Sequence, residues 1–189
     1  MLPQFVLASA SPRRRDLLSQ AGLIFTTEPA DIDESPKANE APREYVLRLS
    51  LEKATKLVGA LPVLGADTVV SIDGVLLGKP NDPEAAFKML KLLSGKIHLV
   101  HTGVSLVSSV KSQSIVTVTE VKFIDASDEA LRSYIDSGEP FDKAGGYGIQ
   151  GVGAFLVESI SGSYTGVVGL PVEETVQLLK DFGIVINGN

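Results

Sequence analysis

The order of apolar and polar positions along the chain predicts a mixture of strands and helices. Short or alternating apolar runs indicate strands, whereas apolar residues three or four positions apart indicate helices. The predicted strands cover residues 5–8, both arms of a hairpin at 62–80, and residues 97–109, 114–124 and 154–160. The predicted helices cover residues 11–22, 43–61, 82–93, 127–138 and 169–183. Because strands and helices alternate and a hairpin is present, we expect a mixed α/β fold rather than a purely parallel sheet.

Cap and turn residues mark the ends of these elements. Ser11, followed by a proline, predicts a helix start, because serine caps the first turn and proline loses no hydrogen bond there. Asp73-Gly74 between two apolar runs predicts a tight hairpin turn. Residues 29–42 are polar and interrupted by prolines, so they predict a long loop, and a second loop at 142–153 is dense in glycine.

The composition narrows the class of protein. At 189 residues, with 44% hydrophobic and 21% charged residues, the chain is expected to form one domain or one unit of two lobes. Its net charge of −6 argues against a general nucleic-acid binder. The absence of cysteine excludes disulfides, thiolate catalysis and zinc–thiolate sites. No apolar run approaches the roughly 20 residues of a membrane span, and the N-terminus lacks the pattern of a signal peptide, so we expect a cytoplasmic protein.

The densest positive charge of this acidic chain lies at Arg13, Arg14 and Arg15, in the first turn of a predicted helix. Cations oppose the helix dipole there, whereas the free N–H groups of a helix N-terminus bind anions. Arginine's planar guanidinium also suits phosphate oxygens. The cluster therefore predicts either a polyanion site or a solvated turn that pairs with acids such as Asp16. Arg15 is the member expected to be plain surface.

Asp67 stands between apolar segments of a predicted strand, in the sequence GADTVV. Strand interiors are depleted in aspartate, and a buried carboxylate needs a cation, hydrogen-bond donors or a water-filled cleft. A carboxylate at a cleft can bind Mg²⁺ or act as a general base; the alternative is an aspartate that only caps a turn. Because Gly65 precedes it and Thr68 follows, we favour a functional strand end.

Further residues could belong to the same site. Lys79, at the end of the hairpin, comes close to Asp67 if the hairpin closes, although lysines at strand ends are common. The glycine loop lets the backbone approach a ligand and expose its N–H groups, and its Gln150 could read a base edge; the alternative is a flexible connector. Lys53 resembles a solvated helix residue, and Glu34 is a possible metal ligand in an acidic loop.

The remaining candidates are weaker. His98 and His101 are the only histidines and lie three apart in a predicted strand, so they face opposite sides. We expect structural roles for both. Tyr147 and Tyr164 suit packing as well as base stacking.

Six stretches, taken in order, resemble the Maf-like family of nucleoside triphosphate pyrophosphatases. They are SASPRR (9–14), EKA (52–54), GADTVV (65–70), GKP (78–80), DKAGGYGIQG (142–151) and VVGLP (167–171). The resemblance implies one domain of two lobes over residues 1–189, in which helices flank a mixed, elongated sheet around a central cleft, similar to the inosine triphosphate pyrophosphatases. It also implies a cytoplasmic homodimer that hydrolyses nucleoside triphosphates to the monophosphate and pyrophosphate with a divalent cation, Mg²⁺ or Mn²⁺.

The resemblance assigns site residues by motif. Asp67 matches the proton acceptor, and together with Glu34 it matches the positions near the metal. The positions tied to base selection are Arg13, Thr68 and Gln150. The polar and basic set around the phosphates is Ser9, Arg14, Lys53 and Lys79.

The loop AGGYGIQG resembles the branch of the family that acts on dTTP and UTP. Two alternatives are the sibling activity on 7-methyl-GTP or other modified nucleotides, and a nucleotide-binding inhibitor of septum formation. Two positions depart from the family's pattern: Asp142 stands where glycine is common, and Thr165-Gly166 stands where many members carry an asparagine. Neither departure touches Asp67 or Gln150, so they bear on the rim of the site and on substrate range.

Overall fold

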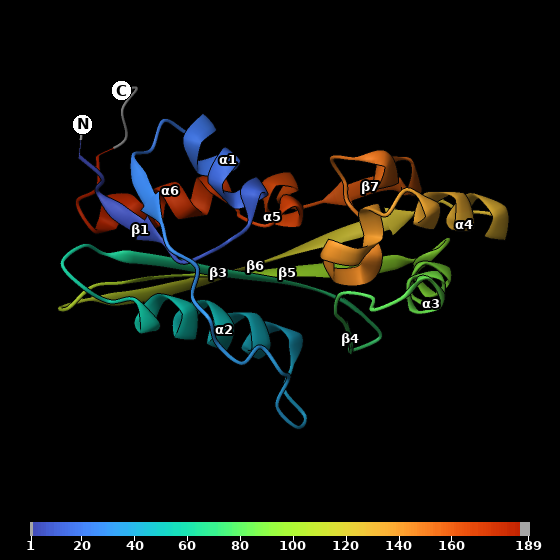
Figure 1. Ribbon diagram of the computed structural model, residues 1–189, viewed down its shortest axis with the longest axis horizontal. Coiled ribbons are helices and arrows are strands. Elements are labelled where there is room, and N and C mark those ends of the chain that lie inside the picture. The colour runs from blue at the N-terminus through green and yellow to red at the C-terminus, as the bar shows by residue number, and fades with distance from the viewer. Residues whose placement is uncertain (1, 186–189) are drawn as a thin grey trace.

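The computed structural model describes residues 2–185, which form helices packed around one seven-stranded sheet (Figure 1). The strands are β1 (Phe5–Leu7), β2 (Phe25–Thr27), β3 (Val63–Ile72), β4 (Val75–Leu77), β5 (Ile97–Val107), β6 (Ser112–Phe123) and β7 (Val157–Ser161). The α-helices are α1 (Pro12–Gln20), α2 (Pro42–Lys56), α3 (Pro83–Leu93), α4 (Asp128–Asp136), α5 (Tyr164–Val168) and α6 (Val172–Asp181). Three 3₁₀ turns, η1 (Glu139–Asp142), η2 (Ala144–Gly146) and η3 (Val152–Leu156), connect α4 to β7.

The sheet is mixed, which confirms the expected fold class. Its strand order is β2-β1-β3-β5-β6-β7, with β4 paired to β3. The long strands β3, β5 and β6 are antiparallel neighbours, and the short β1 runs parallel to both β2 and β3. The predicted hairpin is present, and its turn residues Asp73 and Gly74 have φ angles of 51° and 80°, as the tight turn requires.

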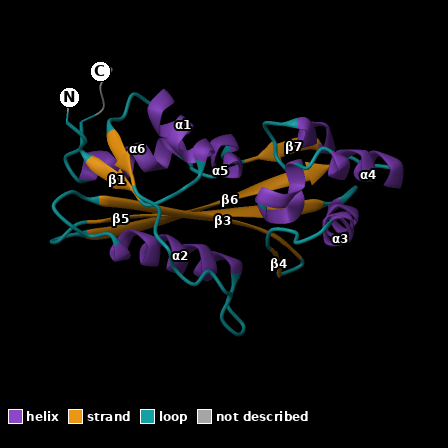
Figure 2. Ribbon diagram, in the orientation of Figure 1, coloured by secondary structure: helices purple, strands orange, loops and turns teal. Residues whose placement is uncertain are grey.

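Helices cover both faces of the sheet (Figure 2). Helix α2 lies across β3 and β5 on one face, while α1, α5 and α6 lie on the opposite face. An apolar cluster that includes Leu18, Leu64 and Leu178 fills the space beneath α1 and α6. A second cluster that includes Leu90 and Leu131 lies at the other end of the sheet, where α3 and α4 pack. No helix within residues 2–185 has the length and apolar character needed to cross a membrane.

Two glycines in the central strands let α2 lie directly on the sheet. A Cβ atom on Gly65 would stand 2.1 Å from the carbonyl oxygen of Ser50, and one on Gly103 would stand 2.4 Å from the carbonyl oxygen of Val46. Both obstacles are helix backbone, which has no side-chain freedom to move aside. The contact therefore fixes α2, and with it Lys53, at a set height above β3.

The edge of β3 is open in the middle. At one end it pairs with β1 through Val63 and Leu64, and at the other end it pairs with β4 from Val70 onward. Residues 65–69 have a strand partner only on their other side, in β5. The gap lies beyond the carboxyl end of β1, which is where open α/β sheets bind ligands.

Most predicted elements are present, with differences at their ends. Helix α2 ends at Lys56 rather than at residue 61, because the chain leaves the helix before the exposed Gly59 and turns toward β3. The last helix begins at Val172, since Gly169 has a φ of 131° and Pro171 serves as its cap. Strand β7 begins three residues later than expected, because residues 152–156 form η3. Strand β2 and helix α5 were not predicted, as neither is long enough to show a periodic pattern.

Adding a methyl group under α2 is expected to destabilise the fold. Gly103→Ala should lower the free energy of unfolding by about 3 kcal/mol, because the new Cβ meets helix backbone that must be displaced. Urea denaturation followed by circular dichroism measures the change. Gly59→Ala is the matched control, since its Cβ would meet no atom closer than 3.8 Å. Equal stabilities of the two variants would contradict this account of the helix–sheet contact.

Candidate active site

A cleft of about 530 Å³ opens at the gap in the edge of β3. Its walls come from the β1–α1 connection, the 28–41 loop, helix α2, the end of the β3–β4 hairpin and the glycine loop after η1. Every residue that the sequence assigned to the site lines this cleft: Ser9, Arg13, Arg14, Glu34, Lys53, Asp67, Thr68, Lys79 and Gln150. The structure therefore brings together side chains that are up to 141 positions apart in sequence, from Ser9 to Gln150.

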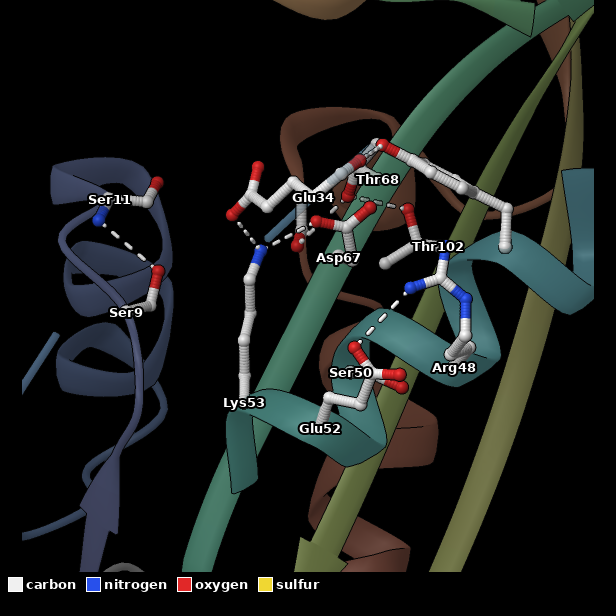
Figure 3. A network of polar contacts seen from close by, with 12 residues as sticks. Ser9, Ser11, Glu34, Arg48, Ser50, Glu52, Lys53, Asp67, Thr68 and Thr102 are labelled. Atoms are coloured by element: carbon white, nitrogen blue, oxygen red, sulfur yellow. Dashed lines mark hydrogen bonds and ion pairs between the residues drawn. The ribbon is translucent and has the colours of Figure 1, made fainter. Parts of the chain in front are cut away.

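Lys53 lies between two carboxylates at the base of the cleft (Figure 3). Its Nζ is 2.7 Å from Oδ1 of Asp67 and 2.7 Å from Oε1 of Glu34. Lys53 and Asp67 are each only 7% exposed, whereas half of the Glu34 side chain is accessible. Two of the three N–H donors of Lys53 are thus used on carboxylates, so this residue is a buried counter-ion rather than the solvated helix residue that composition suggested.

The two carboxylates differ in their electrostatics. Burial raises the pKa of Asp67, and the charges of Lys53 and Arg14 offset that rise only in part. Burial also acts to raise the pKa of Glu34, but there the hydrogen bond from Lys53 and the nearby cations outweigh it, so the pKa of Glu34 is lowered. Of the two, Asp67 is the carboxylate with the stronger tendency to take a proton.

Arg14 is held in one position by three acceptors. Its Nε donates to the carbonyl oxygen of Gly169 at 2.8 Å, Nη1 donates to Oγ of Ser9 at 3.2 Å, and Nη2 donates to Oγ1 of Thr68 at 3.2 Å. Burial lowers the pKa of Arg14, while the charge of Asp67 opposes that shift. Arginine remains protonated in proteins, so the cleft contains a fixed cation that is oriented before any ligand binds.

The hydroxyl of Thr68 belongs to a relay with a defined direction. Thr102 on β5 donates to the carbonyl oxygen of Gly166 at 2.8 Å, so its oxygen accepts from Thr68 at 3.0 Å. Thr68 in turn accepts from Arg14. Its hydrogen is therefore directed to an acceptor within the protein, either Thr102 or the carbonyl oxygen of Gly169 at 3.4 Å, and a lone pair is left for a further donor.

Arg13 forms a different contact, across the mouth of the cleft. Its Nη1 is 3.0 Å from Oδ2 of Asp142 in η1, and the other oxygen of Asp142 is 2.6 Å from Nζ of Lys143. The Asp142 side chain is 65% exposed, so this ion pair is weak and exchangeable. Arg15 points to solvent and lies 3.8 Å from Asp16, which confirms the expectation that it is surface.

Lys79 and Gln150 lie at the rim. Both side chains are exposed, and neither makes a hydrogen bond or ion pair to any other residue of the described range 2–185. They are therefore free to turn toward a ligand.

The predicted role of the loop glycines is wrong in one respect. The N–H groups of Gly145, Gly146, Gly148 and Gly153 are not displayed to a ligand, because all four donate to the protein. Only the N–H of Gly151, which lines the cleft, donates to no other residue of the range 2–185. The glycines instead allow close packing against neighbouring side chains. A Cβ on Gly151, for example, would stand 2.2 Å from Oε2 of Glu139.

Sequence reasoning missed Tyr45, which also lines the cleft. Its hydroxyl donates to the carbonyl oxygen of Glu34 at 2.8 Å, and burial together with the charges of Asp67 and Glu34 raises its pKa to about 12. Tyr45 precedes Lys53 by eight residues on α2, a spacing that places both near one stripe of the helix. That spacing was the signal available in the sequence.

Both histidines are structural, as expected. Nε2 of His98 is 2.8 Å from the hydroxyl of Tyr147, and burial lowers the pKa of His98 to about 4. Nε2 of His101 is 2.9 Å from Oγ of Ser71. Neither lines the cleft, although Tyr147 does, packed edge-on against His98.

Comparison with known proteins adds independent information. Residues 4–182 match a family model described as "Maf-like protein". A protein of Syntrophus aciditrophicus named dTTP/UTP pyrophosphatase is 48% identical over 95% of this chain and 90% of its own length. A protein of the same name from Hahella chejuensis is 48% identical over 97% of this chain and 94% of its own length. Among solved structures, the Staphylococcus aureus Ham1 protein covers 65% of this chain and 72% of its own, with 14% identity and a TM-score of 0.44.

Removing the buried ammonium group should cost stability in a pH-dependent way. Lys53→Met is expected to lower the free energy of unfolding by about 3 kcal/mol at neutral pH, because Asp67 then stays buried without its cation. Burial already raises the pKa of Asp67, and losing Lys53 raises it further. Asp67 of the folded variant therefore takes up a proton as the pH falls. The loss of unfolding free energy relative to wild type should then shrink toward about pH 4.

Urea denaturation of wild type and variant across that pH range measures both effects. Lys88→Met, on the exposed face of α3, is the matched control and should change stability little at any pH. A loss for Lys53→Met that is the same at neutral and acidic pH would show that Asp67 does not depend on this lysine.

Proposed function

The chain belongs to the Maf-like protein family, and from this premise we propose that it is a hydrolase of acid anhydrides that converts dTTP and UTP into the monophosphate and pyrophosphate. The observation that carries the proposal is the convergence in one cleft of Asp67 with the cations Arg13, Arg14 and Lys79. A cleft of this size takes a nucleotide, and its cations match a triphosphate in an otherwise acidic chain. The same activity is named for the relatives that match nearly the whole chain.

In the proposed complex, the phosphate chain meets two kinds of cation. Arg14 is already fixed by Ser9, Thr68 and Gly169, so it stabilises charge without reorganising. Arg13, which the family resemblance ties to base selection, is here also assigned to the triphosphate, and it must leave Asp142 to reach a phosphate. An exposed pair of this kind contributes only about 0–1 kcal/mol, and a triphosphate carries enough charge to displace it.

The reaction follows from the placement of Asp67. A water oxygen bonds to the α-phosphorus, the bond from that phosphorus to the bridging oxygen breaks, and pyrophosphate leaves. The water's proton passes to Asp67. An ordinary aspartate has a pKa of about 3.9 and is a weak base; burial raises the pKa of this one, which supports the role. Lys53 stays beside the carboxyl group throughout and keeps it oriented.

The site residues also fit a divalent cation, Mg²⁺ or Mn²⁺. Glu34 and Asp67 each use one oxygen on Lys53, and within residues 2–185 their second oxygens accept no hydrogen bond. Residues 2–185 contain no cluster of three potential metal-ligating side chains. Magnesium, however, is commonly held by one or two carboxylates with substrate phosphates and water. When bound here, such an ion would neutralise charge on the phosphate oxygens.

Base selection follows from the relay at Thr68. Because its hydrogen is used on Thr102 or on the carbonyl oxygen of Gly169, Thr68 accepts a hydrogen bond but does not offer one. Uracil and thymine present an N3–H donor beside the O4 acceptor, which suits Thr68 together with the amide of Gln150. Cytosine presents an acceptor at N3, so two acceptors would face each other.

Three further properties complete the proposal. The chain is taken as one domain of two lobes, which is supported by a continuous sheet with an apolar cluster toward each end. The enzyme is taken to be a cytoplasmic homodimer, as the resemblance to the family implies. Its binding partner is a nucleoside triphosphate rather than a nucleic acid, in keeping with the net charge of −6.

Replacing the proposed general base, Asp67, should strongly reduce turnover and leave the fold intact. Asp67→Asn is expected to lower kcat on UTP by about 10²–10⁴-fold, because the amide cannot take the proton. The fold should persist, since the amide oxygen still accepts from Lys53 and a buried charge is removed. Pyrophosphate release and thermal unfolding measure the two effects, with Asp136→Asn at the exposed end of α4 as the matched control. Wild-type turnover by Asp67→Asn would exclude the assigned role.

A nucleotide panel tests the substrate. In the presence of Mg²⁺, kcat/KM for pyrophosphate release should be about 100-fold higher for UTP than for CTP, because cytosine places an acceptor against Thr68. UTP and dTTP should lie closer to each other than either lies to CTP, since they differ by one methyl group. A preference for 7-methyl-GTP would replace the proposed substrate, and tight binding without release would indicate a nucleotide-binding regulator.

A further inference from the structure

The carboxylate of Glu139 collects three hydrogen bonds inside the loop that carries Gln150. Oε2 accepts from the backbone N–H of Val152 at 2.7 Å, and Oε1 accepts from the N–H of Gly153 at 3.1 Å. Oε1 also accepts from the hydroxyl of Tyr134 at 3.1 Å. Glu139 is half-buried and does not line the cleft, so it has no direct part in the proposed reaction.

Tyr134 extends this network to the other side of the loop. Its side chain is buried on α4, and its hydroxyl accepts from the N–H of Gly148 at 3.2 Å. Glu139 and Tyr134 thus hold the backbone at residue 148 and again at residues 152–153. Gln150 lies midway between these anchors, and its own side chain has no partner within the described residues.

The glycines of the loop show how closely it wraps around these two side chains. A Cβ on Gly148 would be 2.9 Å from Oε1 of Glu139, and one on Gly153 would be 2.6 Å from the hydroxyl of Tyr134. Such contacts are closer than real Cβ atoms tolerate. Glycine at these positions therefore allows the loop to close around the carboxylate of Glu139. That carboxylate accepts the hydrogen bonds from loop N–H groups that water or a ligand would otherwise accept.

We propose that Glu139 is a positioning residue for base recognition, which acts by fixing the loop backbone on both sides of Gln150. The inference rests on the proposed function, because it assumes that Gln150 contacts the pyrimidine. Exposed amide side chains lose rotational freedom when they bind, and a loop that also had to become ordered would weaken the contact further. Glu139 removes that second cost, so its effect falls on the nucleobase part of the substrate and leaves the triphosphate part unchanged.

Glu139→Gln is the main test variant. The amide keeps the size of the side chain but replaces one acceptor oxygen with an NH₂ donor, which faces backbone N–H groups. KM for UTP should rise about tenfold while kcat changes little, because one anchor of the loop, an N–H of Val152 or Gly153, loses its acceptor and the loop loosens. Inhibition by inorganic tripolyphosphate, which has no base, should keep its wild-type Ki. Glu129→Gln on α4 carries the same charge change away from the loop and should match wild type.

A double-mutant cycle shows whether Glu139 acts through Gln150. Gln150→Ala alone should raise KM for UTP, and adding Glu139→Gln should then raise it little further, because the side chain that the loop positions is already absent. Tyr134→Phe, which keeps the packing and removes the hydroxyl, should act in the same direction as Glu139→Gln with a smaller effect. Thermal unfolding confirms that each variant is folded.

The possible results separate this inference from the function on which it rests. Absence of pyrophosphate release from UTP and dTTP by the wild-type protein would overturn both. With an active wild type, an unchanged KM in Glu139→Gln would overturn only the positioning role. A fall in kcat and weaker tripolyphosphate binding alongside the rise in KM would also overturn it, because they would indicate general structural damage. Fully additive effects of the Gln150 and Glu139 variants would overturn it too, because they would show that Glu139 does not act through Gln150.

Discussion

The site depends on one constraint, which is that strand β3 is longer than the neighbours on its outer edge. β1 and β4 occupy the two ends of that edge, and residues 65–69 between them have a partner only in β5. Since successive side chains of a strand point to opposite faces, Asp67 faces α2 and its neighbour Thr68 faces the side of α1. The open edge makes both accessible from a single cleft. A fully paired β3 would leave the carboxylate of Asp67 and the hydroxyl of Thr68 on separate faces of the sheet, with no common cleft.

The open edge creates an electrostatic problem that the surrounding elements solve. Asp67 is nearly as buried as the apolar core, and an isolated carboxylate there would be costly. Helix α2 brings Lys53 to it at 2.7 Å, and Glu34 shares the same ammonium group. The close approach that Gly65 and Gly103 permit sets this distance. Helix–sheet packing and the protonation behaviour of Asp67 are therefore parts of one arrangement. For this reason Gly65 and Gly103, which do not line the cleft, bear on its chemistry.

The sequence predicted what is encoded locally. Caps such as Ser11, the Asp73-Gly74 turn and the long alternating strands all depend on neighbours within a few residues, and all are present. Asp67 was recognisable because a buried carboxylate in an apolar strand must be stabilised by a partner. The predicted strand end was wrong, however, since Asp67 lies in the middle of β3 and is reached through its open edge. Lys53 and Glu139 were not recognisable in this way, since their roles arise from partners 13 to 19 residues away that local pattern does not reveal. For Lys53 the motif resemblance supplied the position, although the role it implied, phosphate binding, differs from the buried ion pair.

The two groups that meet the base in the proposed complex divide the work between them. The hydrogen of Thr68 is used inside the protein, on Thr102 or on the carbonyl oxygen of Gly169, so in that complex Thr68 discriminates between donor and acceptor at N3. Gln150 has no fixed partner, and its amide can turn to present either its oxygen or its nitrogen. Because the amide can rotate in this way, Gln150 adds affinity for a pyrimidine edge but discriminates little between uracil and cytosine. Specificity then comes from the rigid relay beneath the cleft, while the loop supplies binding energy in proportion to how well its backbone is held.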